Sequence, residues 1–148
     1  MDSIGIAQIN LQHSKVASSN LRRLLTVMHS KIFLIQEPYF FRGVQGLDLE
    51  WGHVHVEGGG IKSRACIYTR KDVNAMKLQQ FCTPDMVTVQ VRVMKDRRTF
   101  KFICCSLYLP YDAPVQSAAL TELLDYCRKF RISFLIGCDA NAHNVNRC

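Results

Sequence analysis

The sequence predicts a mixed α/β domain, and three features of its patterning support this fold class. Apolar runs of strand length recur along the chain, two segments space their apolar residues as helices do, and one segment alternates before a charged turn. A chain of 148 residues has the length of one domain and can bury its own core. Helices between some strands and hairpins between others do not fit a closed all-β barrel or a helical bundle.

The N-terminal part of the chain predicts a strand, a helix and a second strand. The first strand covers residues 4–9 and ends at Asn10, and the second covers residues 32–36 and stops at Glu37-Pro38. This order fits a right-handed crossover between neighbouring parallel strands. Between the strands, Ser18 and Ser19 are the predicted caps of a helix whose apolar positions Leu21, Leu24, Leu25 and Met28 keep helical spacing.

The middle of the chain is rich in glycine. Residues 43–60 predict a loop with a short strand at residues 53–56, and residues 64–69 predict the next strand. His53 and His55 would share one face of the short strand, which suggests a metal site. No third ligand lies near them in the sequence, so surface histidines are the favoured interpretation.

The C-terminal part predicts a hairpin, a helix and a final strand. Residues 86–93 place valines on one face, and a strand over residues 99–109 follows the charged turn of residues 95–98. A helix is predicted from Pro114 to Phe130, because proline suits the first helical turn and the apolar residues keep helical spacing. The last strand covers residues 132–137.

Composition narrows the functional classes. The formal net charge is +7 with a pI near 9.2, which favours polyanionic partners, although the basic residues are spread along the chain. No apolar run reaches the roughly 18 residues of a membrane span, and the N-terminus lacks a secretory signal, so an intracellular protein without membrane contact is expected. The seven cysteines form no Cys-x-x-Cys and predict free thiols rather than disulfides or a zinc site.

Polar residues stand where the predicted strands end. Asn10 and Glu37 follow the first two strands, Tyr108 lies near the end of a later one, and Asp139-Ala140-Asn141 follows the last. In α/β proteins such positions carry reacting groups, because the sheet holds them rigidly under loops that admit substrate. Glu37 and Asp139 are carboxylates that suit Mg²⁺, and Tyr108 can donate to a phosphate oxygen. Taken singly, each residue also fits an ordinary turn, cap or strand terminator.

Together and in this order, the motifs resemble the endonuclease/exonuclease/phosphatase superfamily. They are most similar to the apurinic-like endonuclease domains of arthropod-type non-LTR retrotransposons. The resemblance extends from Ile4 to Asn144 and implies a DNase I-like four-layer α/β sandwich: one domain over residues 1–148, incomplete at its C-terminus. The motifs are Gln8-Ile9-Asn10, Leu34-Ile35-Gln36-Glu37-Pro38, Ser106-Leu107-Tyr108-Leu109-Pro110 and Ile136-Gly137-Cys138-Asp139-Ala140-Asn141-Ala142-His143.

The resemblance also implies a role for each motif residue. Glu37 would bind the divalent metal, Mg²⁺ with Mn²⁺ as an alternative, and Asn10 would support the site. Tyr108 would donate a hydrogen bond to the scissile phosphate. Asp139 would orient or deprotonate the attacking water, and Asn141 would help to position the phosphate.

The implied activity is the nicking of duplex DNA in the nucleus, where the nick primes reverse transcription by a reverse transcriptase region of the same polyprotein. His143 and Gln12 are further candidates, although Gln12 stands where DNA-repair relatives often carry an acidic residue. The late Asp-His pair of the family has no counterpart after His143. We therefore expect these 148 residues alone to be inactive. The alternatives are a fragment that at most binds nucleic acid and a phosphatase acting on another phosphoester, such as an inositol phosphate or sphingomyelin.

Overall fold

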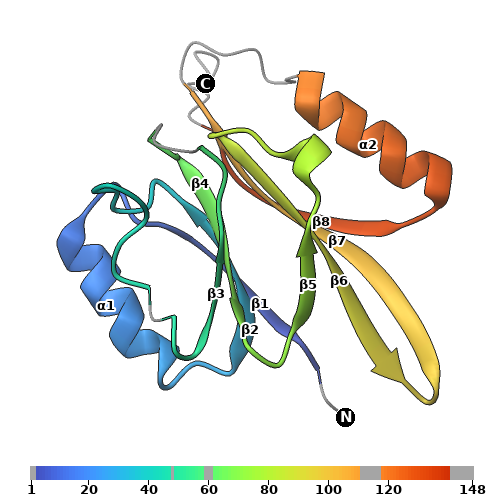
Figure 1. Ribbon diagram of the computed structural model, residues 1–148, viewed down its shortest axis with the longest axis horizontal. Coiled ribbons are helices and arrows are strands. Elements are labelled where there is room, and N and C mark those ends of the chain that lie inside the picture. The colour runs from blue at the N-terminus through green and yellow to red at the C-terminus, as the bar shows by residue number, and fades with distance from the viewer. Residues whose placement is uncertain (1–2, 48, 59–61, 111–117, 141–148) are drawn as a thin grey trace, which may run out of the picture.

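The computed structural model describes residues 3–47, 49–58, 62–110 and 118–140, and these residues form a four-layer sandwich. Helix α1 covers one sheet, helix α2 covers a second sheet, and the two sheets pack against each other between them (Figure 1). In chain order the elements are β1 (Gly5–Asn10), α1 (Lys15–Leu25), β2 (Ser30–Gln36), β3 (Gly52–His55), β4 (Ala65–Arg70), β5 (Asn74–Lys77), the 3₁₀ helix η1 (Gln79–Phe81), β6 (Met86–Lys95), β7 (Arg98–Leu109), α2 (Ala118–Phe130) and β8 (Ser133–Ala140).

Each sheet has four strands in the described part of the chain. The first sheet has the order β1-β2-β4-β3 and the second has the order β5-β6-β7-β8. The β1–β2 pair and the β7–β8 pair are parallel, and the remaining pairs are antiparallel. Helices α1 and α2 make the two parallel crossovers, so β1 and β2 end side by side, as do β7 and β8.

The main core lies between the sheets and follows the two-residue period of the strands. Val87, Val89 and Val91 point into it from β6, as the alternation of this strand predicts, and Cys104 points into it from β7. Thr88 points away from this core, and its hydroxyl donates to the carbonyl of Phe81. Two further apolar clusters lie beneath the helices. Leu21, Leu25, Phe33, Ile35 and Tyr68 belong to the cluster under α1, and Ile103, Cys105, Leu107, Leu123 and Cys127 to the cluster under α2.

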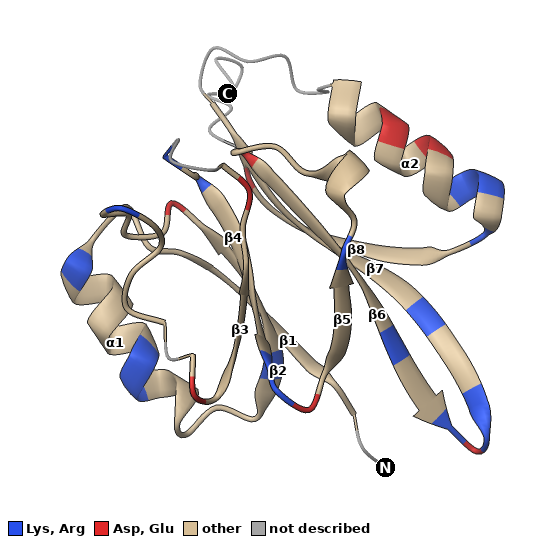
Figure 2. Cartoon of the chain, viewed as in Figure 1, with Lys and Arg blue, Asp and Glu red and all other residues tan. Residues whose placement is uncertain are grey.

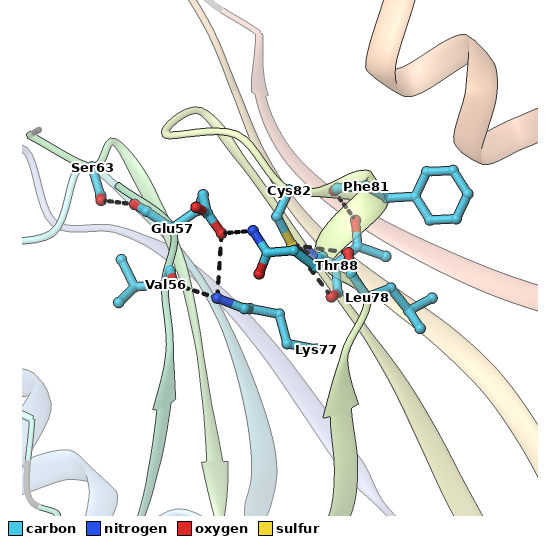
Figure 3. Close-up of polar contacts among 9 residues, drawn as sticks. Val56, Glu57, Ser63, Lys77, Leu78, Phe81, Cys82 and Thr88 are labelled. Carbon is cyan, nitrogen blue, oxygen red and sulfur yellow. Dashed lines mark hydrogen bonds and ion pairs between the residues drawn. The ribbon is translucent and has the colours of Figure 1, made fainter. Parts of the chain in front are cut away.

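A polar clamp fastens the edge of the sandwich formed by β3 and β5. The Lys77 ammonium donates to the carbonyl of Val56 at 3.0 Å and lies 3.3 Å from the Glu57 carboxylate, which also accepts from Gln79 (Figure 3). These contacts lower the pKa of Glu57, with the hydrogen bond from Gln79 as the largest cause. The clamp therefore links the edge strand β3 of the first sheet to the edge strand β5 of the second.

The structure corrects the predicted start of the first helix. Helix α1 begins at Lys15, and its cap is Ser14, whose Oγ accepts from the N–H of Ala17 at 3.1 Å. Ser18 and Ser19, the predicted caps, lie inside the helix and donate their hydroxyls to carbonyls one turn earlier. The prediction therefore placed the cap four to five residues too late.

The other predicted elements are present, with shifted ends and two additions. Strand β5 and the 3₁₀ helix η1 were not predicted. The predicted start of the second helix at Pro114 lies outside the described residues, and α2 ends at Phe130 as expected. Six cysteines are described, and all of them are free thiols. Within the described ranges, neither helix is long and apolar enough to cross a membrane.

Candidate active site

Four strands end at one edge of the sandwich, and their last residues carry most of the predicted site. Asn10 lies opposite Gln36 on the parallel strands β1 and β2, so Glu37 follows directly beside the end of β1. Tyr108 lies opposite Asp139 on the parallel strands β7 and β8. The Asn10 amide donates through Nδ2 to the Asp139 carboxylate, which connects the two sheets. The structure therefore brings Asn10 and Asp139 into contact, with Glu37 close to the first and Tyr108 close to the second.

Both ends of the Asn10 amide are engaged. Its Nδ2 donates to Asp139, and its Oδ1 accepts from the backbone N–H of Gln12 at 2.7 Å. Two fixed partners leave the amide one orientation, so Asn10 holds the Asp139 carboxylate in place without adding charge. Gln12 contributes its backbone N–H to this arrangement, while its side chain is exposed.

A buried polar network lies directly behind these strand ends. The fully buried Gln36 donates through Nε2 to Ser106 Oγ at 3.0 Å and to the Gly137 carbonyl at 3.1 Å, and it accepts from Gln8 at 3.0 Å. Ser106 in turn donates to the Ile35 carbonyl at 2.7 Å. Because buried hydrogen bonds are costly to leave unmade, the network fixes the separation of the strand ends that follow it.

Glycine at position 137 allows the sheets to approach this closely. A Cβ at Gly137 would lie 2.9 Å from both Cβ and Cδ1 of Leu34 and 3.2 Å from Cγ of Gln8. Separations below 3.0 Å between carbon atoms force one group to move. The Gly137 of the last motif therefore has a packing function, two residues before Asp139.

Glu37 lies at the rim and is paired with a histidine that the sequence did not suggest. Its Oε1 lies 3.3 Å from His13 Nε2, and the other ring nitrogen of His13 lies 3.2 Å from the Pro38 carbonyl. Gln12, His13 and Glu37 all have left-handed backbones, with φ of 51°, 54° and 49°. Such conformations are strained for residues other than glycine and concentrate at functional sites.

Hydrogen bonds hold each of these three strained residues. The N–H of Gln12 donates to Asn10, that of His13 donates to the Glu37 carbonyl, and that of Glu37 donates to the Arg64 carbonyl. The last two distances are both 2.8 Å. The turn after β1 and the turn after β2 are therefore fastened to one another at the candidate site.

Tyr108 is contacted by an arginine and an aspartate that directly precede the strands β4 and β6. The Arg64 guanidinium lies 4.8 Å from the centre of the Tyr108 ring and donates two hydrogen bonds of 2.6 Å to the Asp85 carboxylate. These bonds raise the pKa of Arg64, burial opposes the rise, and the charge of Asp85 and contacts with Tyr108 add to it. The Tyr108 N–H also donates to the Asp85 carbonyl at 2.8 Å.

A surface hollow opens at this place and has a mixed lining. His13, Lys62, Arg64, Thr83, Asp85 and Tyr108 border it. The charge of Asp85 is matched by Arg64, and His13 is paired with Glu37, which leaves Lys62 as the additional positive group of the lining. A hollow with this lining favours an anion such as a backbone phosphate.

A divalent ion fits this edge only if most of its ligands come from outside the protein. Among the residues that the structure describes, no three His, Cys, Asp or Glu side chains are close enough to form a metal cluster. Mg²⁺ commonly binds one or two carboxylates and completes its shell with water and substrate phosphate. Glu37 at the rim can provide such a carboxylate, so the donor set suits this ion and does not suit structural zinc.

Two predicted residues, Asn141 and His143, lie outside the described residues. Conversely, sequence reasoning missed His13, Arg64 and Asp85. Nothing in the sequence links Arg64 to Asp85, because they are 21 positions apart and strands β4 and β5 lie between them. His13 could have been noted, because it is three residues past Asn10 in the turn that closes the site.

Comparisons with known proteins agree with this architecture. No family model and no curated protein match the chain. Among solved structures, the chain is similar to the endonuclease domain of TRAS1, a telomere-specific non-LTR retrotransposon, with a TM-score of 0.74 and 27% sequence identity. This likeness covers 96% of the chain and 61% of the TRAS1 domain, so the chain spans about three fifths of that domain.

Two more distant likenesses concern the fold alone. TDP2 of D. rerio complexed with a single-strand DNA product has a TM-score of 0.52 at 15% identity, covering 97% of this chain and 63% of that one. A β-hairpin deletion mutant of the beta toxin from Staphylococcus aureus has a TM-score of 0.53 at 11% identity, covering 98% and 69%. With the four layers and the strand-end motifs, these findings confirm that the chain has the DNase I-like fold of the endonuclease/exonuclease/phosphatase superfamily and is similar within it to the endonuclease domain of a non-LTR retrotransposon.

Proposed function

We propose that the chain is part of an endonuclease that uses a divalent metal ion to hydrolyse one phosphodiester bond in duplex DNA, as in target-primed retrotransposition. The observation that carries the proposal is the contact between Asn10 and Asp139. It joins two sheets at the edge where Glu37 and Tyr108 also lie. The likeness to the TRAS1 endonuclease domain supports the choice of DNA as substrate.

The residues of the chain divide the work of hydrolysis in this proposal. Asp139, oriented by Asn10, accepts a proton from or aligns the attacking water. Tyr108 donates its hydroxyl to a phosphoryl oxygen, where negative charge increases in the transition state. Glu37 holds Mg²⁺, or Mn²⁺ as an alternative, and a bound ion would supply positive charge to the phosphoryl oxygens. Asn141 stays a candidate for positioning the phosphate, and His143 and Gln12 stay further candidates without an assigned role.

The charge of the chain supports a nucleic acid partner. Lys and Arg are distributed over α1, the β6–β7 hairpin and the end of α2 rather than gathered on a single element (Figure 2). A net charge of +7 predicts binding that weakens steeply with salt, because each neutralised phosphate releases counterions. We further propose that the chain acts in the nucleus and that a reverse transcriptase region accompanies it in the full polyprotein.

A second candidate function is binding of DNA without cleavage. The observation that favours it is the pairing of Glu37 with His13, because a carboxylate engaged by an imidazole is less available to a metal ion. In this case the chain would bind duplex DNA through its positive charge alone. Binding would then be independent of Mg²⁺ and insensitive to loss of the Glu37 carboxylate.

A plasmid-relaxation assay tests the proposal. The chain is assayed alone and fused to the portion of the TRAS1 domain that it does not span, with Mg²⁺ or with EDTA. We expect the fusion to nick supercoiled plasmid with Mg²⁺, and we expect Glu37→Ala to lower the rate by about 100-fold or more. Glu122→Ala, which removes an exposed carboxylate from α2, is the matched control and should leave the rate unchanged.

The other outcomes separate the candidates. A folded fusion that binds duplex DNA but never nicks it contradicts the nuclease proposal and favours binding without cleavage. Hydrolysis of a small phosphomonoester in preference to duplex DNA would favour a phosphatase. Nicking by these 148 residues alone that is lost in Glu37→Ala would support the nuclease and contradict the expectation that they are inactive by themselves.

A further inference from the structure

Arg64 connects the two halves of the candidate site. Its carbonyl accepts from the Glu37 N–H at 2.8 Å, and its own N–H donates to the Pro84 carbonyl, also at 2.8 Å. Its side chain donates two hydrogen bonds to the Asp85 carboxylate and lies over the ring of Tyr108. One residue at the start of β4 thus contacts the turn after β2, the turn before β6 and the side chain of Tyr108.

The geometry of the guanidinium indicates what it does there. Nε and Nη2 both donate to Asp85, and Cζ lies over the Tyr108 ring, 4.8 Å from its centre. A guanidinium held in this way cannot offer the same fork to a phosphate, because its Nε–Nη2 edge is already used by Asp85. It is well suited to hold an aromatic ring, since the cation is attracted to the ring face and its own position is fixed.

Tyr108 needs such support because it is the last residue but one of β7. Its backbone is fixed by β8 on one side and by the Asp85 carbonyl on the other. Its side chain is half-buried, and the direction of its hydroxyl depends on what packs against the ring. In the part of the chain that the structure describes, the Arg64 guanidinium lies over the Tyr108 ring.

We propose that Arg64, anchored by Asp85, is a positioning residue that holds the Tyr108 ring so that its hydroxyl faces the phosphate at the strand-end site. The inference rests on the proposed function, because it assigns Tyr108 a phosphate to contact. It predicts that Asp85 affects phosphate binding through Arg64 and Tyr108, because its carboxylate accepts the two hydrogen bonds of Arg64. It also predicts that Arg64→Lys does not hold the Tyr108 ring, because lysine keeps the positive charge but lacks the planar group that donates two hydrogen bonds to Asp85.

The first arm of the test observes the ring itself in the full chain. Tyrosine labelled with ¹³C gives five ring signals, one per tyrosine, and Tyr108→Phe identifies the signal of Tyr108. We expect this signal to move toward the position of a freely exposed tyrosine in Asp85→Asn and in Arg64→Lys. Asp72→Asn breaks the exposed Lys31–Asp72 ion pair elsewhere and is the matched control, in which the signal should not move.

The second arm measures the affinity for a duplex oligonucleotide over a range of salt concentrations. We expect Tyr108→Phe, Asp85→Asn and Arg64→Lys each to weaken binding by about three- to tenfold, the net loss of one hydrogen bond. The double variant Asp85→Asn/Tyr108→Phe should be no weaker than Tyr108→Phe alone, because both changes remove the same contact. The salt slope of Asp85→Asn should equal that of the unmodified chain.

The outcomes distinguish failure of this inference from failure of the proposed function. An unmoved Tyr108 signal in folded Asp85→Asn and Arg64→Lys overturns the inference, whatever the chain binds. Additive losses, or an Arg64→Lys variant that binds as the unmodified chain does, also overturn it, because Arg64 would then act on its own or by charge alone. If the unmodified chain binds no duplex DNA, the proposed function fails, and the ring signal still decides whether Arg64 positions Tyr108.

Discussion

At the scale of single residues, sequence reasoning located positions better than partners. Asn10, Glu37, Tyr108 and Asp139 could be chosen because strand ends in α/β proteins gather at one edge. Their contacts depend on how two sheets stack, which no spacing in the sequence encodes. Gln36 illustrates the limit: it continues the inward face of Ile32 and Leu34, so a buried polar partner could be anticipated. That this partner is Ser106 follows only from the packing of the sheets.

His55 gives the fold a pH dependence between about pH 4 and 6.5. Burial, followed by the nearby charges of His53 and Lys77, lowers the pKa of His55 from 6.5 to about 4. In the unfolded chain the imidazole takes up a proton below 6.5, whereas in the folded chain it stays neutral to about 4. As the pH falls through this window the unfolded state is favoured, and the free energy of unfolding should drop by about 2 kcal/mol on account of this group.

Urea denaturation at a series of pH values measures this loss. His55→Gln should flatten the dependence between pH 6.5 and 4, because glutamine does not titrate. His53→Gln removes an exposed histidine from the same strand and should keep most of the slope. If the free energy of unfolding of His55→Gln fell with pH as steeply as that of the unmodified chain, the pH dependence would belong to other groups. His55 also corrects the prediction of two surface histidines, since it is half-buried and lies 2.9 Å from the hydroxyl of Thr69.

At the scale of elements, apolar periodicity identified both helices and most strands. The residues that mark where a helix begins were less informative. Ser14, Ser18 and Ser19 are chemically equivalent caps in the sequence. The turn after β1 selects Ser14, because its N–H donates to the Leu11 carbonyl and its hydroxyl is free for Ala17. Strand β5 escaped notice because it has four residues and depends on pairing with β6. Such a short strand has no period long enough to detect.

The corrected cap leads to a prediction about α1. Ser14→Ala should lower the free energy of unfolding by about 1 kcal/mol, because the Ala17 N–H loses its partner. Ser19→Ala is the matched control, since it removes an exposed hydroxyl from within the helix and should change stability by less than about 0.5 kcal/mol. The midpoint of urea denaturation reports both, with an unchanged slope. Equal effects of the two substitutions would contradict the assignment of Ser14 as the cap.

At the scale of the whole molecule, the sandwich is fastened at both edges. Asn10 and Gln8 join β1 to β8 near the candidate site, and Glu57 and Lys77 join the β3 and β5 edges. The α/β fold class could be predicted from alternation and crossover rules, and the four layers from the resemblance of the motifs to the superfamily. The hydrogen bonds that join the two sheets could not be predicted, since each of them joins residues that are remote in sequence. These links are what keep groups from two sheets in one site.

The outer strand β8 makes self-association the expected behaviour of the chain at high concentration. Within the described residues no strand pairs with its outer edge, and Phe134 and Leu135, on opposite faces, are 47% and 46% exposed. Unprotected apolar edges of this kind pair with other chains, and a lysine on the edge opposes pairing. We expect light scattering after gel filtration to show a mass that rises with concentration, and to show less rise in Phe134→Lys and Leu135→Lys. Met94→Lys, on the exposed β6–β7 hairpin, should behave as the unmodified chain; a concentration-independent monomer would contradict the prediction.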